Sequence, residues 1–160
     1  MSLRPISMCD VMVIALLDGQ KTETRRVKKD DKPPYAPGDL LWVKEMLQRD
    51  TIDGIARYTR HNEPVIPFLC WRWKRDVLPS RFMPKAATRI WLKALEVRPE
   101  KLLEIHRPGL KAEGIDTAEP YGGWPEFADL WNHLHAKPGE RWAENPWVWV
   151  IRFERTEAGQ

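Results

Sequence analysis

The sequence has little cysteine, few histidines and no obvious metal-binding pattern. Cys9 and Cys70 stand far apart and outside any C-x-x-C pair, a spacing typical of free, reduced thiols. His133 and His135 are two residues apart, so on a helix they would point to different faces. We therefore predict no metal and no cofactor.

Long apolar runs are also missing. No stretch approaches the ~20 residues of a membrane helix, so no membrane partner is expected. Small residues of a signal-peptide cleavage site are absent after the first apolar stretch, where the chain continues as Asp18-Gly19-Gln20-Lys21. We expect a cytoplasmic protein with a single domain over 1–160, of which 156–160 form a loose tail.

Positive charge is concentrated in two segments, although the net charge of the chain is only +3. Residues 21–32 hold six basic and three acidic residues, and residues 71–89 hold six basic residues against Asp76 alone. Two basic segments on an otherwise acidic chain indicate a face that meets phosphate. Two solvated loops are the alternative interpretation.

Apolar periodicity predicts an α+β fold in which several short strands surround one core, as in a small barrel. Ser7 or Asp10 is expected to cap the first helix, and Gly19 to end it in the left-handed conformation. The last strand is apolar on both faces and is therefore expected to be central. Helices are predicted over 8–17, 99–106, 109–113 and 124–135, and strands over 40–44, 55–59, 88–97 and 147–153.

The chain contains nine tryptophans, and most of them must pack in the core. Trp131 and Trp149 are interpreted as core residues. Trp42, Trp71 and Trp73 adjoin the basic segments, where stacking on a base would contribute ~1–3 kcal/mol per base. Simple packing remains open for these three as well.

Five segments carry a family resemblance. Gly19-Gln20-Lys21-Thr22-Glu23-Thr24-Arg25-Arg26 resembles the G-x-K-x-x-T-x-R signature of the ASCH family, within the PUA-like superfamily. The likeness runs from about Met8 to Phe153, and some segments resemble the longer, phage-associated members. It implies a small PUA-like mixed or antiparallel β-barrel with flanking helices. The other matching segments are GDLLWVKE at 38–45, PSRFMPKAATRI at 79–90, KAEGI at 111–115 and NPWVWVI at 145–151.

The resemblance also implies a site. ASCH proteins are taken to bind RNA by likeness to PUA domains, and some small bacterial members hydrolyse the amide of N4-acetylcytidine with a lysine, a threonine and a glutamate. Lys21 and Thr24 match the first two positions, and Glu113 is the match for the third. RNA, single-stranded nucleic acid or a modified nucleoside is the implied partner. Its expected contacts are Arg25, Arg26, Trp42, Glu45, Trp71, Lys85 and Arg89.

The chemistry of such a site sets two conditions. Amide hydrolysis needs a nucleophile, a base and an acid, and Lys21 can be the base only when its amine is neutral. A free lysine titrates near ~10.4, so burial and neighbouring arginines must lower its pKa by about 3, against the effect of Glu113. Residues three apart share a face on a turn but not on a strand, so Lys21 and Thr24 require a turn after Gly19.

Three functions remain open from the sequence. The first is an amidohydrolase acting on an acylated base, and the second is a module that binds RNA or modified nucleic acid without catalysis. The third is a phage accessory protein that acts through protein contacts. The Lys21–Thr24 pair favours catalysis, whereas the basic segment 71–89 favours a polyanion as the partner. The two indications are compatible if the substrate is a modified base within a strand. A basic turn that merely links the first helix to the barrel is the alternative for 19–26.

Overall fold

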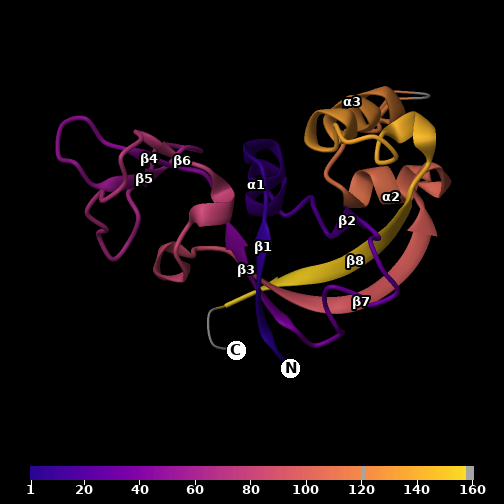
Figure 1. Cartoon of the computed structure of the whole chain (residues 1–160), viewed down its shortest axis with the longest axis horizontal. Coiled ribbons are helices and arrows are strands. Elements are labelled where there is room, and N and C mark those ends of the chain that lie inside the picture. Colours follow the sequence, from indigo (N-terminus) through magenta and orange to yellow (C-terminus); the bar gives the residue numbers. More distant parts are fainter. Residues whose placement is uncertain (120–121, 158–160) are drawn as a thin grey trace.

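The computed structural model describes residues 1–119 and 122–157 and has a mixed α+β architecture (Figure 1). The larger sheet has the strand order β1-β3-β7-β8-β2, and a smaller sheet has the order β5-β4-β6. The strands are β1 (Leu3–Ser7), β2 (Glu23–Val27), β3 (Leu40–Lys44), β4 (Leu47–Arg49), β5 (Ala56–Tyr58), β6 (Val77–Leu78), β7 (Trp91–Lys101) and β8 (Trp147–Thr156). The α-helices are α1 (Asp10–Leu17), α2 (Arg107–Ala112) and α3 (Trp124–Leu134), and short 3₁₀ turns are η1 (Ser80–Phe82), η2 (Lys85–Ala87), η3 (Leu102–Glu104) and η4 (Trp142–Glu144).

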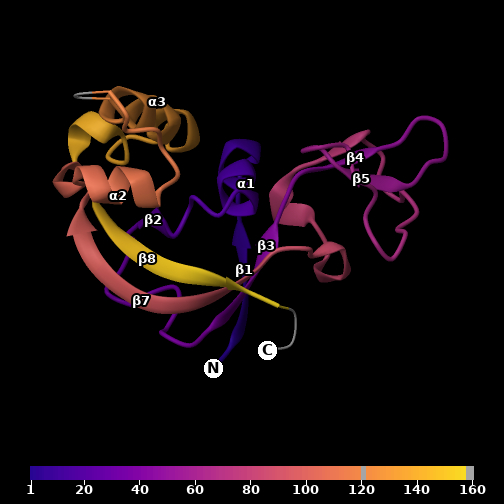
Figure 2. The same ribbon diagram turned by 180° about the vertical axis from the view of Figure 1, so that it is seen from behind.

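The larger sheet is curved and open. Its strands pair antiparallel except β1, which runs parallel to β3. The long β7–β8 ladder shifts register between Ala94 and Glu96, and a bulge of this kind bends the strand that carries it. Figure 2 shows the resulting arc of β7 and β8. Within the described residues no ladder joins β1 to β2, so the sheet curves like a barrel wall without closing. The predicted α+β class is confirmed.

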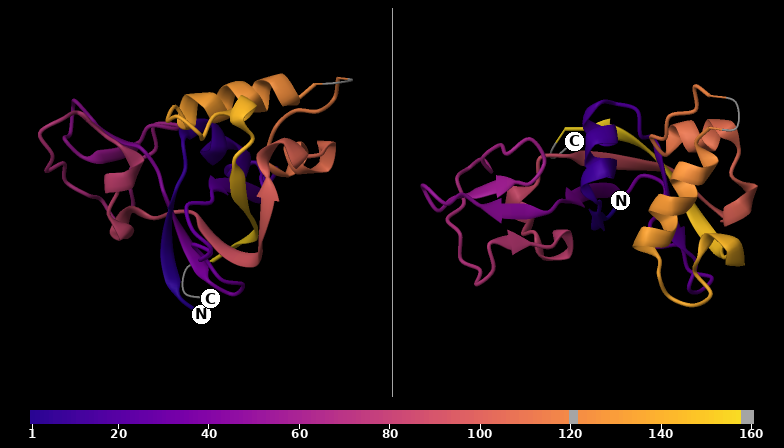
Figure 3. Two further views of the ribbon diagram at one scale, coloured as in Figure 1. Left: turned by 45° about the vertical axis from the view of Figure 1, so that its right-hand side comes forward. Right: turned by 90° about the horizontal axis from the view of Figure 1, so that it is seen from above.

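Helix α1 occupies the middle of the molecule. The smaller sheet lies on one side of it, and α2 and α3 lie on the other (Figures 1 and 2). The view from above in Figure 3 gives the same order. The space between α1 and α3 therefore lies over β2 and β8, where the candidate site is found.

Three apolar clusters hold these parts together. One packs α1 against the larger sheet, one fills the smaller sheet, and the third holds α2 and α3 over the far end of β8. β8 contributes to two clusters: Ile151 and Phe153 belong to the first, and Val148 and Val150 to the third. Both faces of β8 are therefore covered, which explains its unbroken apolar run and confirms that it is central.

The first helix begins later than the sequence suggests. Ser7 ends β1, a strand that was not predicted, and Cys9 is the N-cap residue with no side-chain capping bond. The expected cap by Ser7 or Asp10 is wrong. The Asp10 carboxylate instead accepts a hydrogen bond from Thr59 Oγ1 at 2.9 Å. Gly19 does adopt the left-handed conformation, with φ of 74°.

Two further segments differ from expectation. Residues 99–101 extend β7 instead of starting a helix, because they pair with β8, and only the 3₁₀ turn η3 follows. Of the predicted loose tail, Thr156 is still part of β8, paired with Trp91. Residues 158–160 lie outside the described residues. No helix in the described part of the chain is long and apolar enough to cross a membrane.

Candidate functional site

Lys21 is brought to Glu113 by backbone hydrogen bonds at the start of β2. After the turn at Gly19, the Lys21 amide donates to the carbonyl of Ala15 at 3.0 Å, and the Thr22 amide donates to Ala112 at 2.7 Å. These bonds fasten the chain between the end of α1 and the end of α2. The chain turns at Asp18 and Gly19, whereas residues 20–22 form no turn and Thr24 already lies in β2. The turn predicted after Gly19, which would place Lys21 and Thr24 on one face, is therefore not formed by these residues.

Gly114 permits this close approach of the two helix ends. Its φ is +90°, and a Cβ at this position would lie 2.6 Å from the Cβ of Ala15. Any side chain here would thus combine a strained backbone with a collision. The glycine of the predicted A-E-G-I turn is what allows α2 to end against Lys21.

The centre of the site is a buried ion pair. Lys21 Nζ donates to Glu113 Oε2 at 2.6 Å and to the Glu113 carbonyl oxygen at 3.2 Å. The two side chains are 0% and 2% exposed. Arg25 Nη1 donates to the other carboxylate oxygen of Glu113 at 3.1 Å, so one buried carboxylate serves two cations.

Arg25 links this pair to a wider network. Its guanidinium also donates to Glu100 at 3.1 Å and to Glu23 at 3.4 Å, while Arg98 lies 3.8 Å from Glu23. Arg25 is therefore in contact with three carboxylates. Glu100 and Glu23 compensate its charge in addition to Glu113.

Burial lowers the pKa of Lys21, and the nearby charges of Arg26 and Arg25 lower it further, although Glu113 acts in the opposite direction. Removing an ammonium from water disfavours its charged form. An arginine stays protonated at any ordinary pH, so Arg25 can balance the Glu113 carboxylate when Lys21 gives up its proton. A lysine that acts as a catalytic base needs a pKa lowered in this way.

Thr24 lies in β2, opposite Ile151, and is fully buried. Its Oγ1 has no hydrogen-bond partner in the described part of the chain. A buried hydroxyl without a partner is uncommon in a folded protein. Lys21 and Thr24 are three residues apart in sequence, and within the described part of the chain no hydrogen bond joins their side chains.

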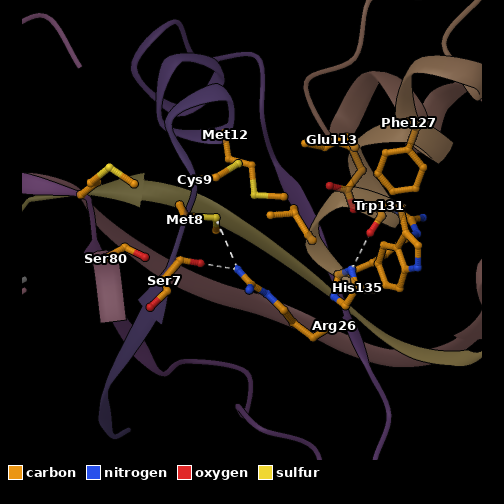
Figure 4. A pocket seen from close by; sticks show the side chains of 14 residues that line it. Ser7, Met8, Cys9, Met12, Arg26, Ser80, Glu113, Phe127, Trp131 and His135 are labelled. Carbon is orange, nitrogen blue, oxygen red and sulfur yellow. Dashed lines mark hydrogen bonds and ion pairs between the residues drawn. The ribbon is translucent and has the colours of Figure 1, made fainter. Parts of the chain in front are cut away.

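A cavity of about 240 Å³ adjoins this network between α1, β2 and α3 (Figure 4). Glu113, Arg25 and Arg26 bring polar groups to its wall. Arg26 is fixed by donating to the carbonyl of Ser7 at 2.7 Å. The remaining lining is largely apolar and comes from Ser7, Met8, Cys9, Met12, Met46, Ser80, Phe127, Leu130, Trp131, Leu134 and His135.

One wall of the cavity carries two stacked rings. Trp131 and His135 lie with ring centroids 3.8 Å apart and planes 18° from parallel. His135 Nδ1 is 3.1 Å from the Trp131 carbonyl, and burial lowers the pKa of this imidazole. Trp131 is the core residue that was expected, but its place in the cavity and that of His135 were missed. The i, i+4 spacing along α3 was the available signal.

The structure divides the predicted site residues into two groups. Lys21, Glu113, Arg25 and Arg26 form or adjoin the ion pair, and Thr24 is buried in β2 beside Arg25 in sequence. Lys21 and Thr24 are not among the described residues that line the cavity. The others belong to the side of the smaller sheet, namely Trp42, Glu45, Trp71, Lys85 and Arg89.

Within the second group, Arg89 and Glu45 form a structural pair. Arg89 donates to both oxygens of buried Glu45, at 2.9 and 2.8 Å, and to Glu63 at 3.0 Å. Trp42 and Trp71 pack half-buried against the core of the smaller sheet. Lys85 is exposed. Any contact of these residues with a nucleic acid stays a prediction.

Metal ligation has no evident location in residues 1–119 and 122–157, where no group of three or more histidine, cysteine, aspartate or glutamate side chains is placed to hold an ion.

Solved structures with a similar fold are known. The chain resembles a crystal structure of an ASCH domain from Lactobacillus crispatus JV V101, with a TM-score of 0.52 over 96% of this chain and 79% of that chain. The chain has the fold of an ASCH domain. The sequence identity is 11%, so the likeness concerns the fold and leaves the activity to the residues of the site.

Two further structures share the ASCH fold of this chain. Protein EF3133 from Enterococcus faecalis V583, of family DUF984, gives a TM-score of 0.52 at 12% identity over 98% of this chain and 80% of its own. The hypothetical protein PH0355 gives 0.51 at 11% identity over 98% of this chain and 100% of its own. No family model matches the sequence, and no curated protein matches it.

Proposed function

We propose that this chain is an amidohydrolase that removes an acyl group from the exocyclic amine of an N4-acylcytidine-like base. The observation that carries the proposal is the buried Lys21–Glu113 pair at 2.6 Å, in which burial lowers the pKa of the lysine. An ammonium that loses its proton readily beside a carboxylate at a cavity wall is an acid–base pair.

The proposed roles follow from the contacts. Neutral Lys21 accepts the proton of the Thr24 hydroxyl as its oxygen attacks the amide carbon, and the C–N bond breaks as a proton passes through Glu113 to the leaving amine. Water then hydrolyses the threonine ester and releases the carboxylic acid. Arg25 and Arg26, both at the cavity wall, are placed to stabilise the oxyanion that develops on the amide oxygen.

The scheme has one structural requirement. Glu113 lines the cavity, whereas Lys21 and Thr24 are absent from its lining among the described residues. The Glu113 side chain must therefore rearrange when the amide enters, so that Lys21 and Thr24 can reach the reacting carbon. Catalytic hydrogen bonds commonly tighten only in the complex with substrate.

The shape of the cavity suits a single base. Its volume is about 240 Å³, somewhat below the range of pockets for larger, drug-sized ligands. The stacked Trp131 and His135 rings, with Phe127 beside them, offer flat apolar surfaces to a pyrimidine. The arginines supply the few polar contacts that orient it.

Substitution of Thr24 tests the proposal. Purified protein should release cytidine from N4-acetylcytidine and its longer acyl analogues, followed by chromatography. Thr24→Ser keeps the hydroxyl and should retain turnover, whereas the nearly isosteric Thr24→Val should lower kcat by roughly 10²-fold or more. Equal activity in the serine and valine variants would remove Thr24 from the mechanism.

A binding module is the second candidate, and one observation favours it. Lys21 is entirely unexposed and Glu113 is engaged by two cations, as in an ion cluster that only stabilises a fold. Absence of turnover on every acyl analogue, together with binding of an unmodified strand, would establish this second candidate over the hydrolase.

A further inference from the structure

A second hollow lies on the smaller-sheet side, and we call it the basic groove. Its volume is about 500 Å³. It contains two aromatic rings and three cationic side chains, and no carboxylate is among its described lining residues. The lining consists of Trp73, Lys74, Arg75, Val77, Leu78, Pro79, Arg81 and Phe82.

The two rings of the basic groove are available for stacking. Phe82 is 55% exposed, and the Arg81 guanidinium lies 4.7 Å from its ring centroid. Trp73 is half-buried against the core of the smaller sheet and meets Trp71 edge-on at 4.9 Å. The Arg72 guanidinium lies 5.1 Å from the Trp73 ring centroid, so each ring carries an arginine beside it. Exposed Phe82 is therefore the more accessible platform for a flat ligand.

The cations of the basic groove stand apart from the acidic side chains that the structure describes. Among the described residues, no carboxylate forms an ion pair with Lys74, Arg75 or Arg81. The nearby acid, Asp76, lies instead 3.7 Å from Arg49 of β4. The surface therefore presents positive charge beside aromatic rings, which is complementary to a polyanion that carries flat bases.

The basic groove adjoins the cavity of the candidate site across the turn η1. Ser80 lines the cavity, whereas its chain neighbours Pro79 and Arg81 line the groove. The turn is held in place because Lys44 of β3 donates a hydrogen bond to the Arg81 carbonyl and the Met83 amide donates to Ser80 at 3.0 Å. One short, fixed turn thus separates the two hollows.

We infer that the basic groove binds single-stranded nucleic acid. One base stacks on Phe82 or Trp73, and Lys74, Arg75 and Arg81 contact the phosphates. A neighbouring nucleotide crosses η1 and places its base in the cavity; this second step rests on the proposed hydrolase function. The substrate is then an acylated base within a strand. A duplex fits less well, because its bases are already paired and stacked on each other.

Fluorescence anisotropy with a labelled ten-nucleotide strand tests the groove. The strand carries no acyl group, so binding is measured independently of hydrolysis. Phe82→Ala should weaken binding roughly 5- to 100-fold, the usual loss when one stacking ring is removed. The matched control is Trp147→Ala, because Trp147 is a 50% exposed ring in β8, outside the groove, and it should change affinity less than twofold.

Charge provides a second variant for the same measurement. Replacing Lys74 and Arg75 together by glutamate should lower the slope of log Kd against log salt by about 0.7 for each phosphate that the groove no longer neutralises. Lys137→Glu with Arg141→Glu makes the same change in net charge at exposed positions elsewhere and should alter the slope less.

Several results would overturn the inference: equal losses in Phe82→Ala and Trp147→Ala, equal changes of slope in the two charge variants, or equally tight binding of a duplex or of polyglutamate. The link to the cavity is tested by turnover. An acylated strand should give a kcat/KM at least tenfold above that of the free acylated nucleoside, and a better rate on the nucleoside would break the link. Hydrolysis without strand binding would contradict only the proposed role of the basic groove. Strand binding without hydrolysis would contradict only the proposed hydrolase function.

Discussion

Glu113→Gln is expected to lower the free energy of unfolding by about 3–5 kcal/mol, the usual cost of breaking a buried ion pair from one side. The carboxylate is 2% exposed and holds both Lys21 and Arg25. Its loss leaves a buried ammonium without a counter-charge, whereas Arg25 keeps Glu100 and Glu23. Urea denaturation at pH 7 measures the change.

The same variant has a characteristic pH dependence. Lys21 in the folded protein without Glu113 should lose its proton well below the unfolded value of 10.5. The unfolded chain then binds more protons than the folded one, so stability rises with pH in this window, and the deficit relative to wild type should shrink as pH is raised from 7 toward 10.

Two control variants sharpen this prediction. Glu104→Gln changes an exposed glutamate on η3 and should stay within about 0.5 kcal/mol of wild type. Adding Lys21→Met to Glu113→Gln should restore part of the lost stability, because it removes the stranded cation. A Glu113→Gln protein as stable as Glu104→Gln would contradict the buried network.

Lys21→Met is expected to lower kcat on N4-acetylcytidine by roughly 10²- to 10⁴-fold, the usual contribution of a general base. Methionine has nearly the length of the lysine and suits a side chain with no exposed surface, while Glu113 keeps Arg25 as partner. The fold should therefore survive. Release of cytidine over time, with circular dichroism on the same sample, separates loss of the base from loss of structure.

Lys111→Met is the control for this variant, since Lys111 is an exposed lysine at the end of α2. Its turnover should equal that of wild type. If Lys21→Met kept more than a tenth of the wild-type kcat, another group would have to be the base.

The sequence predicted the local parts of this fold well. Alternation along the predicted strand 88–97 is observed, because Ile90, just before β7, and Leu92 and Ala94 within it are all at most 1% exposed. Helix α3 covers the predicted 124–135 almost completely. These patterns are local, because burial of one face repeats with the period of the element.

Contacts between distant residues could not be predicted in the same way. β1 was missed because its outer residues are exposed and only Ile6 is deeply buried, so its alternation is short. The pairing of Arg89 with Glu45, which lies 44 residues away in sequence, was not visible in the sequence. The cavity wall formed by Trp131 and His135 depends on how α3 packs over β8, and the helical pattern alone does not reveal that packing.

The candidate site was accessible mainly through the family resemblance. The motif at 19–26 and the A-E-G-I turn supplied Lys21, Thr24 and Glu113, and the structure brings Lys21 and Glu113 into contact. The role of Arg25 as the second partner of Glu113 was not visible in the sequence. Glu113 raises the pKa of Lys21, whereas Arg25 lowers it and shares the charge of the carboxylate.

Titration of Lys21 distinguishes a catalytic base from a permanent counter-ion of Glu113. The ¹³Cε and ¹⁵Nζ resonances of Lys21, assigned by comparison with Lys21→Met, are followed from pH 6 to 11. If Lys21 is the base, its pKa lies below the ordinary 10.5, and the exposed lysines titrate at higher pH. A midpoint at or above 10.5 would mean that Glu113 holds the proton on Lys21, and it would contradict the proposed hydrolase.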